Sequence, residues 1–125
     1  MIIAAILLST LAAHPEPQSE VDPVSVEKGM ELHKKTGKPL VIQYGTDWCP
    51  PCRQQKAKLK EMLKDRDDFI WAYVDVDKTP TPGVSGIPHM RILLDGKVVH
   101  DKAGYLSPAQ LLRKMKLEAP IGIVD

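Results

Sequence analysis

The segment Cys49-Pro50-Pro51-Cys52 restricts the architecture of this 125-residue chain more strongly than its composition does. These two cysteines are the only ones in the sequence, which excludes a framework of several disulfides and a four-cysteine zinc site. They follow a short apolar run at residues 40–44, and a helical pattern begins near Cys49 and continues to about residue 64. The sequence therefore predicts that both sulfur atoms lie where a buried strand passes into a helix.

A helix N-terminus favours an anionic sulfur, because its first backbone N–H groups lack partners within the helix and the helix dipole is positive there. We therefore expect Cys49 to be an exposed nucleophile whose thiol pKa lies below that of a free cysteine. Cys52, one turn further along, is expected to lie beneath Cys49 and to attack the mixed disulfide that Cys49 forms. Pro50 and Pro51 carry no N–H, which leaves fewer donors for the thiolate and predicts a comparatively reducing disulfide couple.

Three other interpretations of the cysteine pair remain open: a structural disulfide, part of a metal site, and two inert thiols. A disulfide that closes so small a loop adds little stability, because the loop-closure contribution grows with loop length. A zinc site needs two further ligands. The available histidines do not have the close paired spacing of a zinc module: they are His33, His89 and His100. Redox chemistry is therefore favoured, and we expect neither a metal nor an organic cofactor.

The order of the predicted elements indicates an α/β fold with a mixed sheet of about four strands, covered by helices on both faces. Helices are expected to begin near Asp22, Cys49 and Ser107, and strands are expected at residues 40–44, 69–76, 89–94 and 97–100. Asp95-Gly96 is a strong signal for a two-residue hairpin turn, so the last two strands should be antiparallel. The first two strands need a crossover helix and should be parallel. The segment 78–86, rich in proline and glycine, should be a loop.

The two ends of the chain do not share this pattern of alternating helices and strands. Residues 2–13 form an apolar run broken only by Ser9 and Thr10, which suits a signal peptide or a membrane anchor at residues 1–13. The alternative is a buried N-terminal segment, because no Lys or Arg precedes the run. Residues 14–23 are expected to form a proline-rich linker, residues 24–117 one folded domain, and residues 118–125 a C-terminal tail.

Charge does not indicate a nucleic-acid partner, because 17 basic side chains are balanced by 16 acidic ones. Part of the basic charge is assigned to the second predicted helix, at Arg53, Lys56, Lys58, Lys60, Lys64 and Arg66. A solvated helix face is the simpler interpretation of this cluster, and a docking surface is the alternative.

Taken together, Trp48-Cys49-Pro50-Pro51-Cys52, the preceding apolar strand and Gly86-Ile87-Pro88 resemble the thioredoxin superfamily. The resemblance covers about residues 24–117. The opening helix followed by Gly37-Lys38-Pro39 is more similar to the extracytoplasmic thioredoxin-like domains of thiol–disulfide interchange proteins than to cytosolic thioredoxins.

The resemblance implies a thioredoxin-like fold and a set of site residues. It implies that the Ile87–Pro88 peptide bond is cis, that Pro88 lies against the two sulfurs, and that the Ile87 backbone pairs with the substrate chain. Trp48 is implied to flank the site, and Pro50 and Pro51 to belong to the substrate-binding surface. The alternatives are an ordinary trans proline at Pro88 and a core tryptophan at Trp48.

The chain also departs from the family pattern. Gln43 replaces the acidic residue that cytosolic thioredoxins carry six positions before the first cysteine, and an amide cannot act as a base. Either a water or another group then takes the proton of Cys52, or the resolving step is slower. Tyr73 stands where many thioredoxins have a lysine, and no segment corresponds clearly to the first strand of the family fold. Gln43 and His89 are candidates for tuning the site, with a packed histidine as the alternative for His89.

Two functions of different classes follow. The first is a monomeric thiol–disulfide oxidoreductase that reduces protein disulfides through Cys49 and Cys52 and receives electrons from an upstream donor. It is expected to be exported, periplasmic or otherwise extracytoplasmic, with residues 2–13 as a potential membrane tether and a cytoplasmic location as the alternative. The second is a thioredoxin-fold binding module or chaperone-like subunit whose thiols are not needed for function.

Overall fold

The computed structural model describes residues 21–119 of the chain. The predicted signal peptide or anchor at residues 1–13, most of the linker at 14–23 and most of the tail at 118–125 lie outside the described residues. Within residues 21–119, no helix combines the length and the apolar character needed to cross a membrane.

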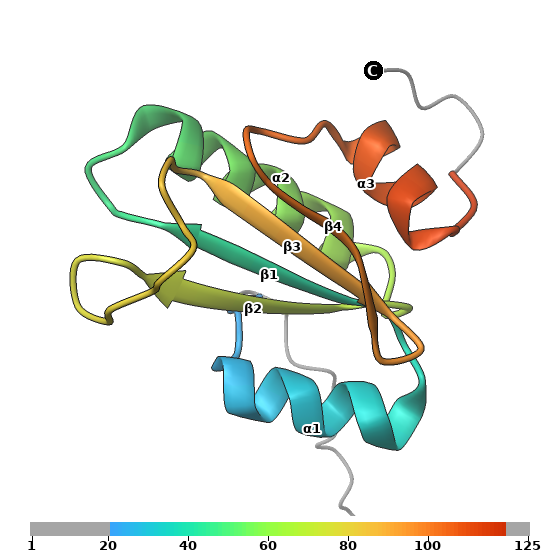
Figure 1. The fold of residues 1–125 in the computed structure, drawn as a ribbon. Coiled ribbons are helices and arrows are strands. Elements are labelled where there is room, and N and C mark those ends of the chain that lie inside the picture. The colour runs from blue at the N-terminus through green and yellow to red at the C-terminus, as the bar shows by residue number, and fades with distance from the viewer. Residues whose placement is uncertain (1–20, 120–125) are drawn as a thin grey trace, which may run out of the picture.

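A four-stranded mixed sheet lies between helices in the described part of the chain (Figure 1). The helices are α1 (Val26–Thr36), α2 (Pro50–Lys64) and α3 (Pro108–Met115), and the strands are β1 (Leu40–Gly45), β2 (Ile70–Asp75), β3 (His89–Leu94) and β4 (Lys97–Ala103). The strand order is β2-β1-β3-β4, in which β1 and β2 are parallel and the other neighbouring pairs antiparallel. Helix α1 covers one face of the sheet and α2 and α3 the other, so the predicted fold class is confirmed.

Strand β1 separates two apolar clusters because its alternate side chains point to opposite faces of the sheet. Val41 belongs to the cluster beneath α2 and α3, whereas Leu40 and Ile42 belong to the cluster that packs against α1. All six residues of β1 are buried. The same alternation directs the side chain of Gln43 toward α2, which brings a buried amide to the face of the sheet that carries the cysteines.

The hairpin between β3 and β4 turns through two residues, as predicted. Asp95 and Gly96 have φ values of 50° and 81°, the left-handed conformations that a two-residue hairpin turn requires. The buried His33 of α1 holds this turn, because its Nε2 accepts a hydrogen bond from the Gly96 N–H at 3.0 Å. Its Nδ1 lies 2.6 Å from the Lys38 carbonyl oxygen and donates to it. His33 therefore joins α1 to the hairpin.

Helix α1 begins later than the sequence predicts. Asp22 is not its N-cap; Ser25 is, and the Ser25 hydroxyl accepts a hydrogen bond from the Lys28 N–H at 3.1 Å. The reason is tertiary pairing, since Val24 forms a parallel bridge with Ala72 at the outer edge of β2. Its N–H donates to the Trp71 carbonyl at 3.0 Å, and its carbonyl accepts from the Tyr73 N–H at 3.1 Å. Val24 thus extends the sheet by one residue where a first strand was not predicted.

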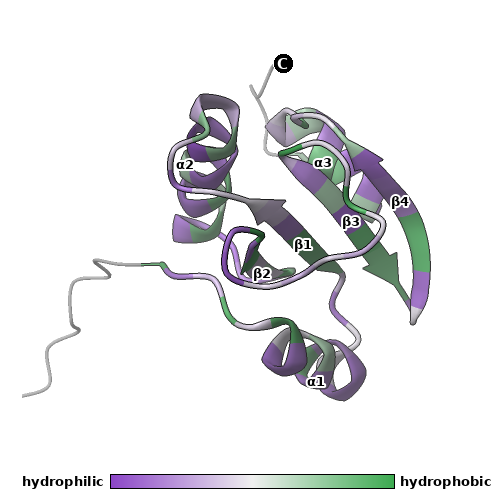
Figure 2. Cartoon of the chain, turned by 60° about the vertical axis from the view of Figure 1, so that its left-hand side comes forward, coloured by the Kyte–Doolittle hydropathy of each residue, from purple (hydrophilic) through white to green (hydrophobic). Residues whose placement is uncertain are grey.

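Helix α2 is mostly hydrophilic (Figure 2), but one member of the predicted basic cluster does not belong to it. The helix ends at Lys64, and Arg66 lies beyond it. The Arg66 guanidinium donates two hydrogen bonds of 2.9 Å to Asp68, which lower the pKa of that carboxyl group. It also donates to the Glu118 carbonyl at 2.9 Å. Arg66 therefore connects the residues after α2 to Glu118, at the start of the C-terminal segment.

A buried amide joins α2 to the segment that follows β4. The fully buried Gln55 accepts a hydrogen bond from the Leu106 N–H through Oε1 and donates one to the Leu106 carbonyl through Nε2, both at 2.8 Å. This pair of bonds satisfies both backbone groups of Leu106 where neither strand nor helix can do so. It fixes α2 relative to the segment that leads into α3.

Replacing Gln55 with leucine keeps the side-chain size but leaves both Leu106 groups without partners. We expect Gln55→Leu to lower the free energy of unfolding by about 2–6 kcal/mol, because each of the two buried groups left unpaired costs about 1–3 kcal/mol. Urea denaturation of the oxidised protein measures the change. Gln54→Leu, at the exposed neighbouring position, is the matched control, with an expected change within about 0.5 kcal/mol. Equal losses in the two variants would contradict the role given to Gln55.

Candidate active site

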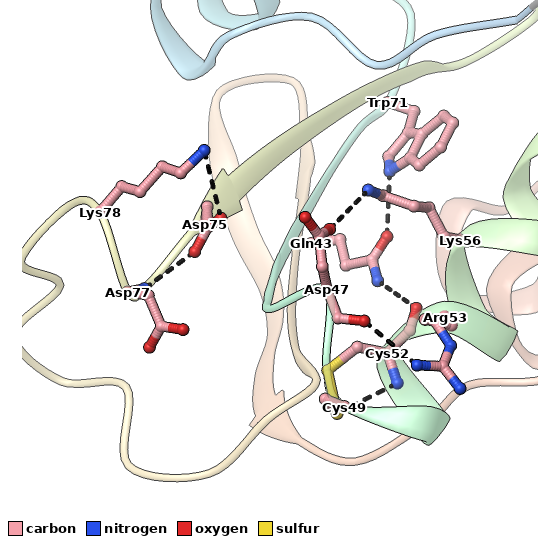
Figure 3. Close-up of polar contacts among 10 residues, drawn as sticks. All are labelled: Gln43, Asp47, Cys49, Cys52, Arg53, Lys56, Trp71, Asp75, Asp77 and Lys78. Atoms are coloured by element: carbon pink, nitrogen blue, oxygen red, sulfur yellow. Dashed lines mark hydrogen bonds and ion pairs between the residues drawn. A yellow bond between two sulfur atoms is a disulfide. The ribbon is translucent and has the colours of Figure 1, made fainter.

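Cys49 and Cys52 form a disulfide at the start of α2, with their Cα atoms 5.2 Å apart. Cys49 is the N-cap residue of the helix, and its Sγ accepts a hydrogen bond from the Cys52 N–H at 3.2 Å. Figure 3 shows this contact together with the S–S bond. The predicted position of both sulfurs at a strand-to-helix junction is confirmed.

The two prolines decide which N–H groups the first turn of α2 offers. Pro50 and Pro51 occupy the first two helical positions and carry no N–H. The first N–H of the helix is therefore that of Cys52, which points at Cys49 Sγ, and the next is that of Arg53, which bonds to the Cys49 carbonyl at 3.0 Å. Cys49 Sγ thus receives its backbone hydrogen bond from Cys52 alone within this turn.

The prediction that Cys49 is exposed is wrong for the disulfide form. Cys49 is 4% exposed and Cys52 1% exposed. The reason is the capping geometry, since Cys49 Sγ is folded back over the helix end to reach both the N–H and the sulfur of Cys52. Both cysteines are thus buried in the disulfide, and the expected role of Cys49 as the attacking residue stays a prediction.

Gln43 anchors the first turn of α2 to the sheet. Its side chain is fully buried; Nε2 donates to the Cys52 carbonyl at 3.0 Å, and Oε1 accepts from the Trp71 indole N–H at 3.3 Å (Figure 3). Sequence reasoning identified Gln43 as a position without a base but did not identify this anchoring. The amide is therefore a positioning group that fixes Cys52.

A glycine at the end of β1 lets Cys52 approach the sheet. A Cβ atom on Gly45 would lie 2.9 Å from Cys52 Sγ, which is closer than the two atoms can pack, and 3.1 Å from Cys52 Cβ, which is also a tight contact. The sequence signal for this contact is a glycine at the end of a buried strand, shortly before the cysteine pair, and the sequence analysis did not name it as a site residue. Gly45 thus belongs to the site.

Trp48 lies on the surface beside the disulfide. It is 66% exposed, so the alternative of a core tryptophan is wrong. Its indole N–H donates to Asp77 Oδ2 at 2.7 Å, which connects it to the loop after β2. The exposed Pro50 and Pro51 follow it in the chain, so an apolar surface borders the cysteines.

The Ile87–Pro88 peptide bond is cis, as the resemblance implies. Pro88 is buried, and its carbonyl accepts a hydrogen bond from the Gly104 N–H at 2.7 Å. The next residue, His89, pairs with Tyr44 in the β-sheet register, so Pro88 lies at the same end of the sheet as Gly45 and the sulfur atom that packs on it. Ile87 is half-buried beside it.

His89 lies on the other face of the sheet. Its Nε2 is 2.6 Å from Asp101 Oδ1, and its ring meets the Tyr44 ring edge-on. Hydrogen bonds from His89, and also from Arg91, hold the pKa of the Asp101 carboxyl below its usual range. Since Tyr44 belongs to the α1 side, this placement is that of the packed histidine, and a tuning role for His89 stays a prediction.

The zinc interpretation has no geometric support in residues 21–119. In that part of the chain, no three His, Cys, Asp or Glu side chains are grouped so as to hold a metal ion. The three histidines considered as ligands lie in α1, at the start of β3 and in β4.

Comparison with known proteins identifies the family. The family model for thioredoxin matches residues 25–117. The thioredoxin of Rhodospirillum rubrum is 35% identical over 82 residues, which cover 62% of this chain and 79% of the relative. The thioredoxin of Pseudomonas aeruginosa is 32% identical over 82 residues, which cover 62% of this chain and 76% of the relative. The crystal structure of the short form of spinach chloroplast thioredoxin f superposes with a TM-score of 0.60 at 24% identity, covering 78% of this chain and 91% of that one.

This chain belongs to the thioredoxin family. Its relatives and its Cys49–Cys52 pair together support a thiol–disulfide oxidoreductase.

Restoring an N–H at Pro51 should make the disulfide couple more oxidising. Pro51→Ala returns the N–H of the second helical position, one of the usual donors to an N-cap side chain. The added hydrogen bond stabilises the reduced, thiolate form, and we expect the reduction potential to rise by about 30 mV, which corresponds to about 1.4 kcal/mol for two electrons. Equilibration with glutathione measures it. Pro108→Ala, in the first turn of α3, is the control and should leave the potential unchanged; an unchanged or lower value for Pro51→Ala would contradict the role of the missing donor.

Proposed function

We propose that this protein reduces disulfide bonds of protein substrates through the Cys49-Pro50-Pro51-Cys52 dithiol. The observation that carries the proposal is the sulfur of Cys49 acting as the N-cap of α2 and paired with Cys52 directly behind it. A helix N-terminus stabilises a thiolate, and the second thiol within bonding reach releases the substrate. The single backbone donor to Cys49 supports the reducing direction, since fewer donors stabilise the reduced form less.

The reaction consists of two exchanges. The Cys49 thiolate attacks one sulfur of the substrate disulfide, the substrate S–S bond breaks, and one substrate thiolate leaves. Cys52, after losing its proton, attacks Cys49 Sγ, forms the intramolecular disulfide and releases the second substrate thiolate. The substrate gains two electrons and the protein loses them, so a dithiol donor must reduce the protein again.

The substrate-facing surface is proposed to consist of Trp48, Pro50, Pro51, Ile87 and Pro88. The high exposure of Trp48 and of the two helix-starting prolines supports this, because an apolar surface around a buried disulfide suits an extended protein segment. Ile87 supports it by its place just before the start of β3, at the same sheet end as the cysteines.

We propose further that residues 2–13 direct the protein out of the cytoplasm, as a cleaved signal or as a membrane anchor in the manner of extracytoplasmic thioredoxin-like domains. The apolar run of signal-peptide length supports this. Cell fractionation of the full chain with a C-terminal tag, followed by N-terminal sequencing, measures it. We expect a periplasmic product shortened by about 13 residues, or an intact product in the membrane fraction. An intact chain in the cytosol would contradict the proposal.

Two cysteine variants separate catalysis from mere binding. Cys49→Ser should lower insulin reduction by dithiothreitol to the uncatalysed rate of dithiothreitol alone, because the attacking thiol is removed and the remaining Cys52 is buried. Cys52→Ser should accumulate a mixed disulfide between Cys49 and the substrate, since the resolving thiol is missing. Insulin precipitation and non-reducing electrophoresis are the measurements.

The double variant Cys49→Ser/Cys52→Ser is the control for trapping and should capture no adduct. If Cys49→Ser kept full insulin reduction, or if the wild-type protein showed none, the proposed function would be wrong. A binding module whose thiols are not needed would keep its partners in all three variants.

A further inference from the structure

A groove of about 360 Å³ opens beside the resolving cysteine. Cys52 forms part of its wall, together with Thr46 and Asp47 after β1, Lys56 of α2 and Tyr73 of β2. The groove lies on the α2 face of the sheet, because Tyr73 pairs with Gln43, whose side chain contacts α2. It gives solvent a path to the neighbourhood of a sulfur that is itself 1% exposed.

Two hydroxyl groups of this groove are unsatisfied. Tyr73 Oη and Thr46 Oγ1 are buried and have no hydrogen-bond partner within residues 21–119. Buried polar atoms are paired in the great majority of cases, so each of these atoms needs an explanation. Both belong to the wall that contains Cys52.

Gly45 lies close to both the Tyr73 hydroxyl and the Cys52 sulfur. A Cβ atom on this glycine would lie 2.9 Å from Cys52 Sγ and 3.5 Å from Tyr73 Oη. The two atoms therefore border one small space, which remains free because residue 45 has no side chain. A sulfur that becomes charged at this place has a hydroxyl donor beside it.

Cys52 needs such a donor only when the disulfide is open. In the disulfide its sulfur is neutral, whereas the resolving step requires its thiolate. The Gln43 amide is held by its contacts with the Cys52 carbonyl and the Trp71 indole, whereas the Tyr73 hydroxyl has no partner within residues 21–119. We propose, on the basis of the oxidoreductase function above, that in the reduced protein Tyr73 donates a hydrogen bond to Cys52 Sγ and thereby stabilises the thiolate that resolves the mixed disulfide.

The surroundings of Tyr73 make it a donor that keeps its proton. The Lys56 ammonium lies 4.1 Å from the centre of its ring and 3.7 Å from Asp47 Oδ1. Burial, followed by the negative charges of Asp47, Asp75 and Asp77, raises the pKa of Tyr73 to about 12. The hydroxyl therefore stays protonated throughout the neutral range. Arg53 and Lys60 are the other cationic residues of the groove wall.

The proton balance follows from this. Cys52 loses its proton to water in the groove, and Tyr73 holds the resulting thiolate without transferring its own proton. When Cys52 attacks Cys49 Sγ, the substrate thiolate leaves, the new disulfide is neutral, and Tyr73 loses its acceptor. Tyr73 is thus assigned to one step, the resolution, and not to the initial attack by Cys49.

Tyr73→Phe removes the hydroxyl and keeps the ring under Lys56. NMR titration of the reduced protein with labelled cysteine should show that the pKa of Cys52 rises by about one, because a hydrogen bond to a charged group is lost. The reaction of the reduced protein with an aromatic disulfide, 5,5′-dithiobis(2-nitrobenzoate), releases one aromatic thiolate in the attack and one in the resolution. At pH values below the pKa of Cys52, we expect the second release to slow by about threefold. The smaller thiolate fraction of Cys52 is partly offset, because a thiolate with a higher pKa is a better nucleophile. The first release should be unchanged.

Tyr44→Phe is the matched control, because it removes a tyrosine hydroxyl from the neighbouring strand on the opposite face of the sheet. It should change neither the pKa of Cys52 nor the second release. Thr46→Val tests the other unpaired hydroxyl. An unchanged Cys52 pKa in Tyr73→Phe, or a rise confined to Thr46→Val, overturns the assignment to Tyr73. The NMR titration needs no turnover, so this result is distinguishable from a failure of the wild-type protein to reduce insulin.

Discussion

The hydrogen bond from the Cys52 N–H to the Cys49 sulfur is the contact around which the active site is built. It gives a sulfur atom the N-cap position that the Ser25 and Ser107 hydroxyls occupy in α1 and α3. Because Pro50 and Pro51 lack N–H groups, this one donor and the helix dipole are what the first turn of α2 offers to an anionic sulfur. The chemistry of the site therefore follows from the way in which one helix begins.

The surrounding fold keeps that helix start in register with the sheet. The buried amide of Gln43 ties the first turn of α2 to β1, and the buried amide of Gln55 ties the middle of the helix to Leu106. Each amide has both its nitrogen and its oxygen in a hydrogen bond, so these two side chains add specificity without leaving either of their own polar atoms unpaired. Gly45 completes the arrangement, because a side chain there would displace Cys52.

Much of the fold could be predicted because local signals agree with the tertiary structure. The Asp95-Gly96 turn, the start of α3 at Ser107 and the strand that leads to Cys49 each need few residues to specify them. The start of α1 could not be predicted, since pairing of Val24 with β2 decides it. The anchoring by Gln43 was missed for a similar reason, because it depends on how the first turn of α2 packs against β1. The burial of Cys49 follows from the way its side chain caps α2, and this geometry cannot be read from the order of residues.

Titration of Cys49 in the reduced protein examines the effect of the helix N-terminus on its sulfur. The alkylation rate of Cys49 by iodoacetamide, followed by mass spectrometry between pH 5 and 10, gives the pKa of its thiol. Stabilisation by the Cys52 N–H and the helix dipole predicts a value near 7, clearly below the value of about 8.5 for free cysteine. A pKa at or above about 8.5 would contradict the role assigned to the start of α2.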